Sequence, residues 1–223
     1  MGEAITLVEN FKVEKVIFNC GEFNKLEQDL IKALDKKKIP YYSCIKELNI
    51  DDNKLYFLNN KVYGNENDNS SVIYTELNNY KFLFMGDAGV AVEEDLIEQY
   101  NLKDIDVLKV GHHGSKYSSS SSFLNATGAE YGVICVGADN SYGHPTSATL
   151  TRLANAGTSV YRTDKNGNVY LLDYGKEGTI NARVIILDSN YELKSIIEKV
   201  TGELDGEPVE YTFTGAKNIY VHT

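Results

Sequence analysis

The sequence lacks several features that would place it in a specialised class. Its 223 residues contain no apolar run near the roughly 20 residues needed to cross a bilayer, and no basic segment followed by an apolar stretch at the start. We therefore expect a soluble chain with no signal peptide and no transmembrane segment, and the compartment stays unknown. Positive charge is also scarce, with 22 Lys and Arg against 32 Asp and Glu. Charge alone therefore does not favour binding to nucleic acid, which needs clustered basic side chains.

Cysteine is scarce as well. Cys20, Cys44 and Cys135 are an odd number without metal-type spacing, and each lies beside apolar, strand-like residues. We expect three buried thiols. With 42% apolar and 24% charged residues, the composition is that of an ordinary globular protein with one main domain.

The early part of the chain predicts a strand, a helix and a second strand. Lys15–Asn19 is apolar and strand-like, and Tyr41–Ile45 resumes that character. Between them, Asn24 followed by Glu27 resembles a capping box, and an apolar face continues to Lys38. Short connections around a helix imply parallel strands with a right-handed crossover.

The middle of the chain places chemically active side chains at strand ends. Ser71–Leu77 and Tyr80–Met85 predict a hairpin, because Asn78-Asn79 tolerates the positive φ of a tight turn. The second strand leads into Asp87 and a helix over residues 88–100. Another buried strand, over residues 107–110, ends in Gly-His-His-Gly at residues 111–114.

The later part gives several further expectations. The serine tract 116–122 is interpreted as a flexible connection or, alternatively, as a mobile loop that offers hydroxyls to an anion. Pro145 suits the first position of a helix that ends near Ala156-Gly157. Residues 160–161 and 169–172 flank a second expected hairpin. Beyond these segments, Ala182–Leu187 predicts a strand and Glu192–Val200 a helix.

Four side chains suited to binding a metal lie at strand-to-helix turns, where open α/β sheets usually place their chemistry: Asp87, His112, His113 and His144. An aspartate with several histidines suits zinc, manganese or iron, and the carboxylate can bridge two ions. Alternatives remain at each position. Asp87 suits a helix N-cap, His144 suits a residue that closes a turn, and His222 suits an exposed tail.

Five segments occurring together in order carry a family resemblance: NSSVIYTEL, YKFLFMGDA, DVLKVGHHGSKYSSSSSFL, AEYGVICVGADNSYGHPTSATLTRL and VYRTDKNG. Over Asn69 to about Asp173, the chain resembles the later half of the metallo-β-lactamase-fold hydrolase domain of the ComEC type. The related domains belong to a DNA-internalisation competence protein and to free-standing ComEC-like hydrolases.

The resemblance implies an α/β fold, the four-layered αββα sandwich, and a catalytic site. Asp87 matches the aspartate that bridges two metals, and His112 matches a later histidine ligand. His113, Ser115 and His144 match polar positions that line the same cleft, as phosphate contacts or proton donors. The implied activity is hydrolysis of a phosphodiester by a metal-bound hydroxide, with zinc or manganese as the cofactor.

One motif of the family is absent. The family carries His-x-His-x-Asp-His in its first half, whereas the first histidine here is His112. We therefore expect residues 1–174 to be a partial domain, incomplete at the N-terminus, and 175–223 an extension of unknown role. A fragment of a longer enzyme is favoured over a natural form that has lost metal catalysis. On either account, we expect this chain alone to bind metal poorly and to have little activity.

Three functions stay open at this point. The first is a phosphodiesterase or nuclease, with nucleic acid or another phosphodiester as the substrate. The second is a hydrolase for a small ester, thioester or lactam. The third is a non-catalytic binding module that keeps only the fold. An incomplete sheet also predicts an unpaired edge and self-association.

Overall fold

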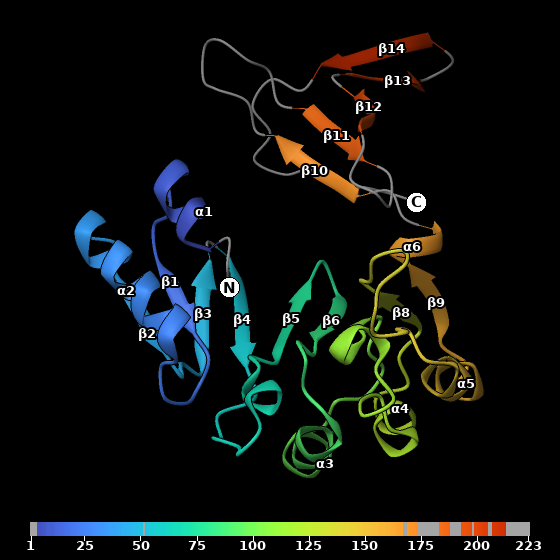
Figure 1. Cartoon of the computed structure of the whole chain (residues 1–223). Helices are drawn as coiled ribbons and strands as arrows, with labels where there is room; N and C mark the ends of the chain where they lie inside the picture. Colours follow the sequence, from blue (N-terminus) through green and yellow to red (C-terminus); the bar gives the residue numbers. More distant parts are fainter. Residues whose placement is uncertain are drawn as a thin grey trace. The chain divides into compact units, whose positions relative to one another are not determined.

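The computed structural model of the chain describes residues 4–50 and 52–166, followed by five later strands whose backbone alone is described (Figure 1). Two compact units are present, Met1–Cys135 with Ser141–Val160, and Val136–Asn140 with Tyr161–Thr223. Each is described by itself. The predicted division into residues 1–174 and 175–223 stays a prediction. Within the described residues, no helix has both the length and the apolar character needed to span a membrane.

A seven-stranded mixed sheet forms the centre of the first unit (Figure 1). In order along the sheet, its strands are β3 (Glu47–Ile50), β4 (Asn53–Phe57), β5 (Ile73–Leu77), β6 (Tyr80–Phe84), β7 (Val107–Lys109), β8 (Tyr131–Ile134) and β9 (Ser159–Arg162). β3 to β6 pair antiparallel, whereas β6, β7 and β8 are parallel. The carboxyl ends of these three strands therefore lie next to one another at the same end of the sheet.

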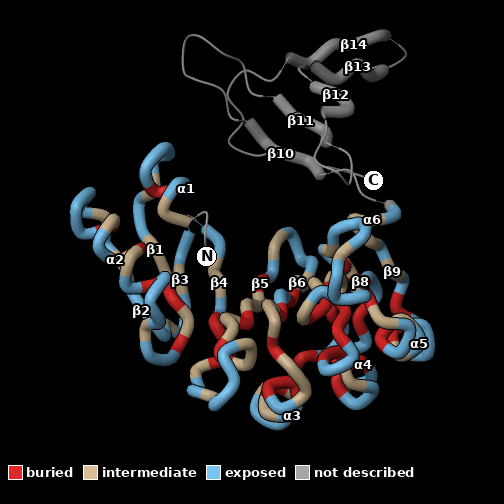
Figure 2. The backbone as a smooth tube through the Cα atoms, viewed as in Figure 1, coloured by how far each residue is buried: buried red, intermediate tan, exposed pale blue. Residues whose placement is uncertain are grey.

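Three helices follow the parallel strands and cover one face of the sheet (Figure 1): α3 (Val90–Gln99), α4 (Ser121–Thr127) and α5 (Ser147–Asn155). The layer between sheet and helices is the most buried part of the unit (Figure 2). Leu83 and Leu108 lie in register on neighbouring strands, and both are fully buried, as are Phe123 of α4 and Leu153 of α5. The prediction of an α/β fold is confirmed.

The first residues form the predicted βαβ unit. α1 (Ala4–Asn10) precedes β1 (Val16–Phe18), α2 (Lys25–Lys37) and β2 (Tyr41–Ser43), and the two strands are parallel. The Asn24 side chain accepts the amides of Leu26 and Glu27, while the Glu27 carboxylate accepts the Asn24 amide. The capping box is therefore present, and the prediction is confirmed.

The β5–β6 hairpin is also as predicted. Asn78 and Asn79 both have positive φ, at 52° and 68°, which matches a two-residue primed turn. That turn sets a register in which Leu77 opposes Tyr80 and Ile73 opposes Phe84.

Two predictions for the later part of the chain are wrong, namely the start of a helix at Pro145 and the second hairpin. α5 begins at Ser147 rather than Pro145, because the Thr146 side chain caps the helix by accepting the Thr149 amide. The second hairpin does not form. β9 belongs to the large sheet, residues 163–166 form the short helix α6 (Thr163–Asn166), and β10 (Val169–Asp173) pairs with β11 (Arg183–Leu187).

The helix predicted over Glu192–Val200 is wrong as well. β12 (Leu193–Ile197) extends the β10–β11 sheet, and β13 (Lys199–Leu204) pairs with β14 (Glu207–Thr212). The segment holds Ile196, Ile197 and Val200, whose β-branched side chains favour strands over helices. The strand predicted over Ala182–Leu187 is confirmed as β11, and His222 lies outside the described residues.

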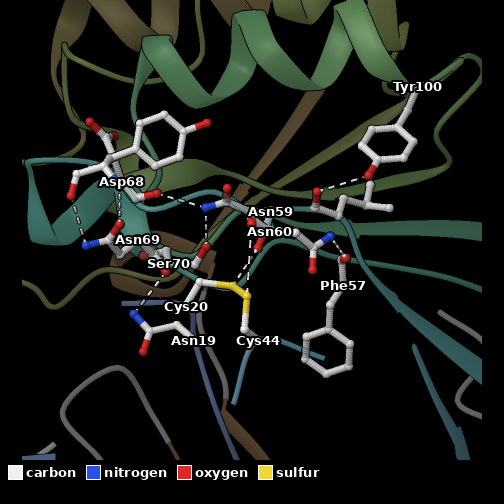
Figure 3. Close-up of a disulfide and its surroundings, with 12 residues drawn as sticks. Asn19, Cys20, Cys44, Phe57, Asn59, Asn60, Asp68, Asn69, Ser70 and Tyr100 are labelled. Atoms are coloured by element: carbon white, nitrogen blue, oxygen red, sulfur yellow. Dashed lines mark hydrogen bonds between the residues drawn. A yellow bond between two sulfur atoms is a disulfide. The ribbon is translucent and has the colours of Figure 1, made fainter. Parts of the chain in front are cut away.

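The cysteine prediction is wrong, because Cys20 and Cys44 form a disulfide (Figure 3). They are 24 residues apart, but they follow the neighbouring parallel strands β1 and β2, so their Cα atoms lie only 4.4 Å apart. Cys135 is exposed rather than buried. The pairing depends on the β1–β2 register, which spacing along the chain does not reveal.

The thiol content tests this disulfide. Alkylation of the folded chain without reductant is expected to add one group, at Cys135, because a disulfide sulfur is not a nucleophilic thiolate. After reduction and unfolding, mass spectrometry should find three added groups. A Cys135→Ser control should show none before reduction. Reaction at Cys20 or Cys44 in the non-reduced protein would contradict the pairing.

Candidate active site

Turns from three neighbouring strands meet at the carboxyl edge of the parallel strands. They are Gly86–Gly89 after β6, the short 3-10 turn Gly111–Gly114 after β7, and, after β8, Cys135 together with residues 141–146. The His112 amide donates to the Gly86 carbonyl at 2.9 Å, and the Thr146 amide donates to the Gly114 carbonyl at 2.9 Å. These backbone bonds fasten the three turns side by side.

Two glycines make this close approach feasible. Gly111 opens the turn after β7, and a Cβ there would lie 3.0 Å from the Ala88 carbonyl oxygen in the turn after β6. Gly114 has φ +81°, and a Cβ there would lie 2.5 Å from Cβ of Pro145. His112 and His113 between them also have positive φ, at 47° and 53°. Such backbone geometry is costly for residues with a side chain, and it concentrates at functional sites.

Asp87 and His113 face each other across the first two turns. The Nε2 of His113 lies 3.5 Å from Oδ1 of Asp87, and both side chains are substantially exposed. The Nδ1 of His113 lies 2.7 Å from the Cys135 carbonyl oxygen. Because a carbonyl only accepts, Nδ1 carries the hydrogen in this contact, and Nε2 is the ring nitrogen that faces Asp87.

His112 and His144 form a second pair. Their ring centroids are 5.8 Å apart, and the Tyr142 ring stacks on His144 at 5.9 Å. Burial lowers the pKa of His144, and the charges of His112 and His113 lower it further, while Asp87 opposes them. The structure therefore brings the four predicted residues Asp87, His112, His113 and His144 to one rim.

Ser115 is placed differently. Its side chain is 2% exposed, and its hydroxyl accepts the Tyr117 amide at 3.3 Å. Its carbonyl accepts the Thr149 hydroxyl at 2.8 Å. These contacts favour a role in holding the turn, and the predicted catalytic role of Ser115 stays a prediction.

This arrangement can be compared with known proteins. A family model described as the metallo-beta-lactamase superfamily matches residues 6–138, which is more than half of the chain. The chain belongs to the metallo-beta-lactamase superfamily. The superfamily predicted from the sequence motifs is therefore confirmed.

Three named proteins are also similar in sequence to this chain. The chain is similar to ComE operon protein 3 of Bacillus subtilis, with 26% identity over 186 residues, covering 81% of this chain and 24% of the relative. It is also similar to competence protein ComA of Neisseria gonorrhoeae, with 40% identity over 104 residues, 46% of this chain and 15% of the relative. Recombination protein 2 of Haemophilus influenzae is 34% identical over 104 residues, 47% of this chain and 13% of the relative. The chain spans about a quarter or less of these relatives, and its predicted resemblance to competence proteins is confirmed.

The superfamily generally binds divalent metals, and the rim fits such an ion in part. Two ligands of a tetrahedral zinc with bonds of about 2.0 to 2.1 Å lie about 3.4 Å apart, close to the 3.5 Å between Asp87 and His113. Within residues 4–50 and 52–166, however, no group of three or more His, Cys, Asp and Glu side chains is arranged to hold an ion. The spacing of Asp87 and His113 is therefore that of two donors in a larger set, and the metal roles predicted for Asp87 and His112 stay predictions.

Residues that sequence reasoning missed hold the Asp87 turn in place. The Asp87 amide donates to the Ser70 hydroxyl at 3.0 Å, and the Gly89 amide donates to Oδ1 of Asp68 at 2.8 Å. Both acceptors come from the segment around a short 3-10 turn, Glu66–Asn69. No local sequence pattern marks these two contacts, because they join residues 17 and 21 positions apart.

The interpretation of the serine tract as a flexible connection is wrong, because its middle is buried and hydrogen-bonded, whereas the contact of its hydroxyls with an anion stays a prediction. Ser118 and Ser119 are buried. The carboxylate of Glu93 on α3 accepts the amides of Ser119 and Ser120, the latter at 2.8 Å. Arg152 on α5 donates to the carbonyls of Ser119 and Ser118, at 2.7 and 2.8 Å. The Ser118 hydroxyl donates to the Gly111 carbonyl, which ties the tract to the histidine turn.

The glycine geometry predicts a stability difference. Gly114→Ala combines a left-handed φ with overlap against Pro145, and should cost about 1 to 3 kcal/mol more than a left-handed glycine in open space. Gly128→Ala is the matched control, with φ +55° and no atom within 4 Å of the added Cβ. Urea unfolding measures both. Equal losses would contradict the packing of Gly114 against Pro145.

Glu93 predicts a pH dependence of stability. Burial raises the pKa of its carboxyl, against the opposing effect of the Ser119 and Ser120 amides and of Arg152. Folded Glu93 therefore keeps its proton to higher pH than unfolded Glu93. The free energy of unfolding should fall as pH rises from the ordinary pKa of a glutamate to the raised pKa of folded Glu93. This dependence on pH should be weaker in Glu93→Gln, which cannot titrate. Urea unfolding at a series of pH values measures it, with exposed Glu94→Gln as the control. Identical slopes in Glu93→Gln and the unmodified chain would refute the assignment.

Proposed function

We propose that this chain carries part of the active site of a metal-dependent hydrolase that cleaves phosphodiesters, in a protein with a competence-related role. The observation that supports it best is the convergence of Asp87, His113 and two further imidazoles at one rim of the sheet. Open sheets of this class use that edge for chemistry. The names of the relatives, which refer to competence and recombination, agree with a DNA-related role.

Each residue has a distinct part in the proposal. Asp87 and His113 would hold the metal, which when bound polarises a phosphoryl oxygen and lowers the pKa of water. The Cys135 carbonyl fixes the His113 ring, so that Nε2 is the atom presented to the ion. His112 and His144 flank this pair and offer ring nitrogens that accept or donate a proton at the substrate.

The substrate class follows from the polarity of the rim and the charge of the chain. The Asp87 carboxylate by itself repels a phosphate, so the rim suits a charged phosphate only with a cation bound between the carboxylate and the imidazoles. With a net charge of −10, the chain offers little general attraction for a nucleic acid backbone. Recognition would therefore depend on the metal and on these few side chains. A hydrolase for an ester, thioester or lactam stays the second enzymatic candidate.

A non-catalytic module is the remaining alternative, favoured by the incomplete metal set among the described residues. The account predicts poor metal retention and little activity for this chain by itself, because a two-metal site needs more ligands than the rim supplies. The proposed self-association also stays open. β3 is an edge strand of the large sheet, and its Ile50 is 49% exposed.

The disulfide bears on the compartment. Disulfides persist in oxidising environments and are rare in the reducing cytosol. The Cys20–Cys44 pair therefore supports a location for this part of the protein in an oxidising compartment.

Asp87 carries the test of the proposed activity. In a version of the chain extended upstream, Asp87→Ala should reduce hydrolysis of bis(p-nitrophenyl) phosphate with manganese or zinc by at least about hundredfold. Loss of a metal donor should exceed the 10- to 100-fold typical of the groups that support one. Circular dichroism should show an unchanged fold, and exposed Glu98→Ala should keep full activity. Retained turnover in Asp87→Ala would refute its role.

A substrate panel separates the candidates. The same preparation should hydrolyse the phosphodiester at least tenfold faster than a p-nitrophenyl ester, a thioester or a chromogenic lactam. A reversed preference would favour the second candidate, and inactivity on every substrate with metal bound would favour the non-catalytic module.

A further inference from the structure

The buried side-chain amide of Asn59 lies against the backbone of Asp68 and Ser70, near the Cys20–Cys44 disulfide (Figure 3). Asn59 is 7% exposed, and its Nδ2 donates two hydrogen bonds, to the carbonyls of Asp68 and Ser70, each at 2.8 Å. Both hydrogens of this amide are therefore used, on residues two positions apart.

Those same two residues hold the Asp87 turn through their side chains. The Ser70 hydroxyl accepts the Asp87 amide at 3.0 Å, and the Asp68 carboxylate accepts the Gly89 amide at 2.8 Å. The Asn59 side chain therefore holds the backbone of Asp68 and Ser70, whose side chains accept the amides of the Asp87 turn. We propose that Asn59 is a positioning residue for Asp87.

The position of Asn59 itself is well anchored. It follows β4, and the preceding Leu58 is held at both ends, because its amide donates to the Val72 carbonyl at 2.8 Å and its carbonyl accepts the Tyr100 hydroxyl at 3.2 Å (Figure 3). Asn69, between the two acceptors, is held separately, because its side chain bonds the backbone of Tyr63 and its carbonyl accepts the Asn19 amide at 2.9 Å. The amide of Asn59 therefore works from a fixed point on one side of the site.

An asparagine is required by this geometry. An aspartate at position 59 has no N–H to offer to two carbonyls and would face them with negative charge. Alanine would leave both part-buried carbonyls without this donor, and such groups are costly to leave unpaired. The sequence alone did not predict this role, because Asn59 is one of several asparagines in a polar stretch.

Amide hydrogen exchange tests this directly. In Asn59→Ala, the Asp87 and Gly89 amides are expected to exchange at least tenfold faster than in the unmodified chain, whereas buried sheet amides such as Leu83 and Leu108 change less than threefold. Asn60→Ala is the matched control, because the Asn60 side chain makes one local bond, to the Phe57 carbonyl at 2.8 Å. It should leave Asp87 and Gly89 within threefold.

Ser70→Ala separates the two branches. It should accelerate Asp87 at least tenfold but leave Gly89, which Asp68 holds, within threefold. In the double variant Asn59→Ala with Ser70→Ala, the exchange rate of the Asp87 amide should lie within threefold of its rate in each single variant. The effects should not add, because Asn59 acts on Asp87 through Ser70.

Three results would overturn the proposal. The first is unchanged exchange of Asp87 and Gly89 in Asn59→Ala, and the second is equal acceleration of all protected amides. If Asn59→Ala does not fold, Asn59→Ser, which keeps one donor, is used in its place. The third result is then unchanged exchange of the Asp87 and Gly89 amides in Asn59→Ser. The importance of Asp87 rests on the proposed function, but exchange is measured without metal or substrate, so the two ideas fail separately.

Discussion

The hydrogen bond from the His112 amide to the Gly86 carbonyl is the contact on which the site depends, because it holds the turns after β6 and β7 together. The two turns can approach this closely because Gly111 has no side chain, since a Cβ there would lie 3.0 Å from the Ala88 carbonyl oxygen. A second bond, from Thr146 to Gly114, adds the loop after β8. Asp87, His113 and His144 reach one rim because their backbones are joined in this way.

The groups that face solvent at this rim are supported by buried polar groups behind it. Glu93 and Arg152 hold the serine tract from two helices, and Asn59 bonds the two residues that accept the Asp87 and Gly89 amides. Each such bond contributes about 1 kcal/mol net, but an unpaired buried partner costs more than that. The support is therefore cooperative, since removing one member leaves others without partners. Rigid turns with exposed reactive groups are suited to a site that must bind an ion in a defined geometry.

Sequence patterns predicted the elements whose cause is local. The Asn24 capping box, the Asn78-Asn79 turn and the strands that end at Asp87 and His112 were all predicted, because each depends on neighbouring residues. Features that depend on distant residues were not. The Cys20–Cys44 bond follows from the register of β1 and β2, and the burial of the serine tract follows from Glu93 and Arg152, which lie 26 and 33 residues away from Ser119. The choice between His112 and His113 as the neighbour of Asp87 needed the left-handed backbone of that turn.

The central claim is that the Asp87 rim binds a divalent metal, and a manganese titration followed by amide NMR tests it most directly. Paramagnetic broadening detects weak binding, so it suits a chain that holds only part of a ligand set. The account predicts that the amides of Asp87, His112, His113 and His144 broaden first, and that Asp87→Asn abolishes this selectivity. Broadening that begins at other acidic surfaces, unaffected by Asp87→Asn, would contradict it.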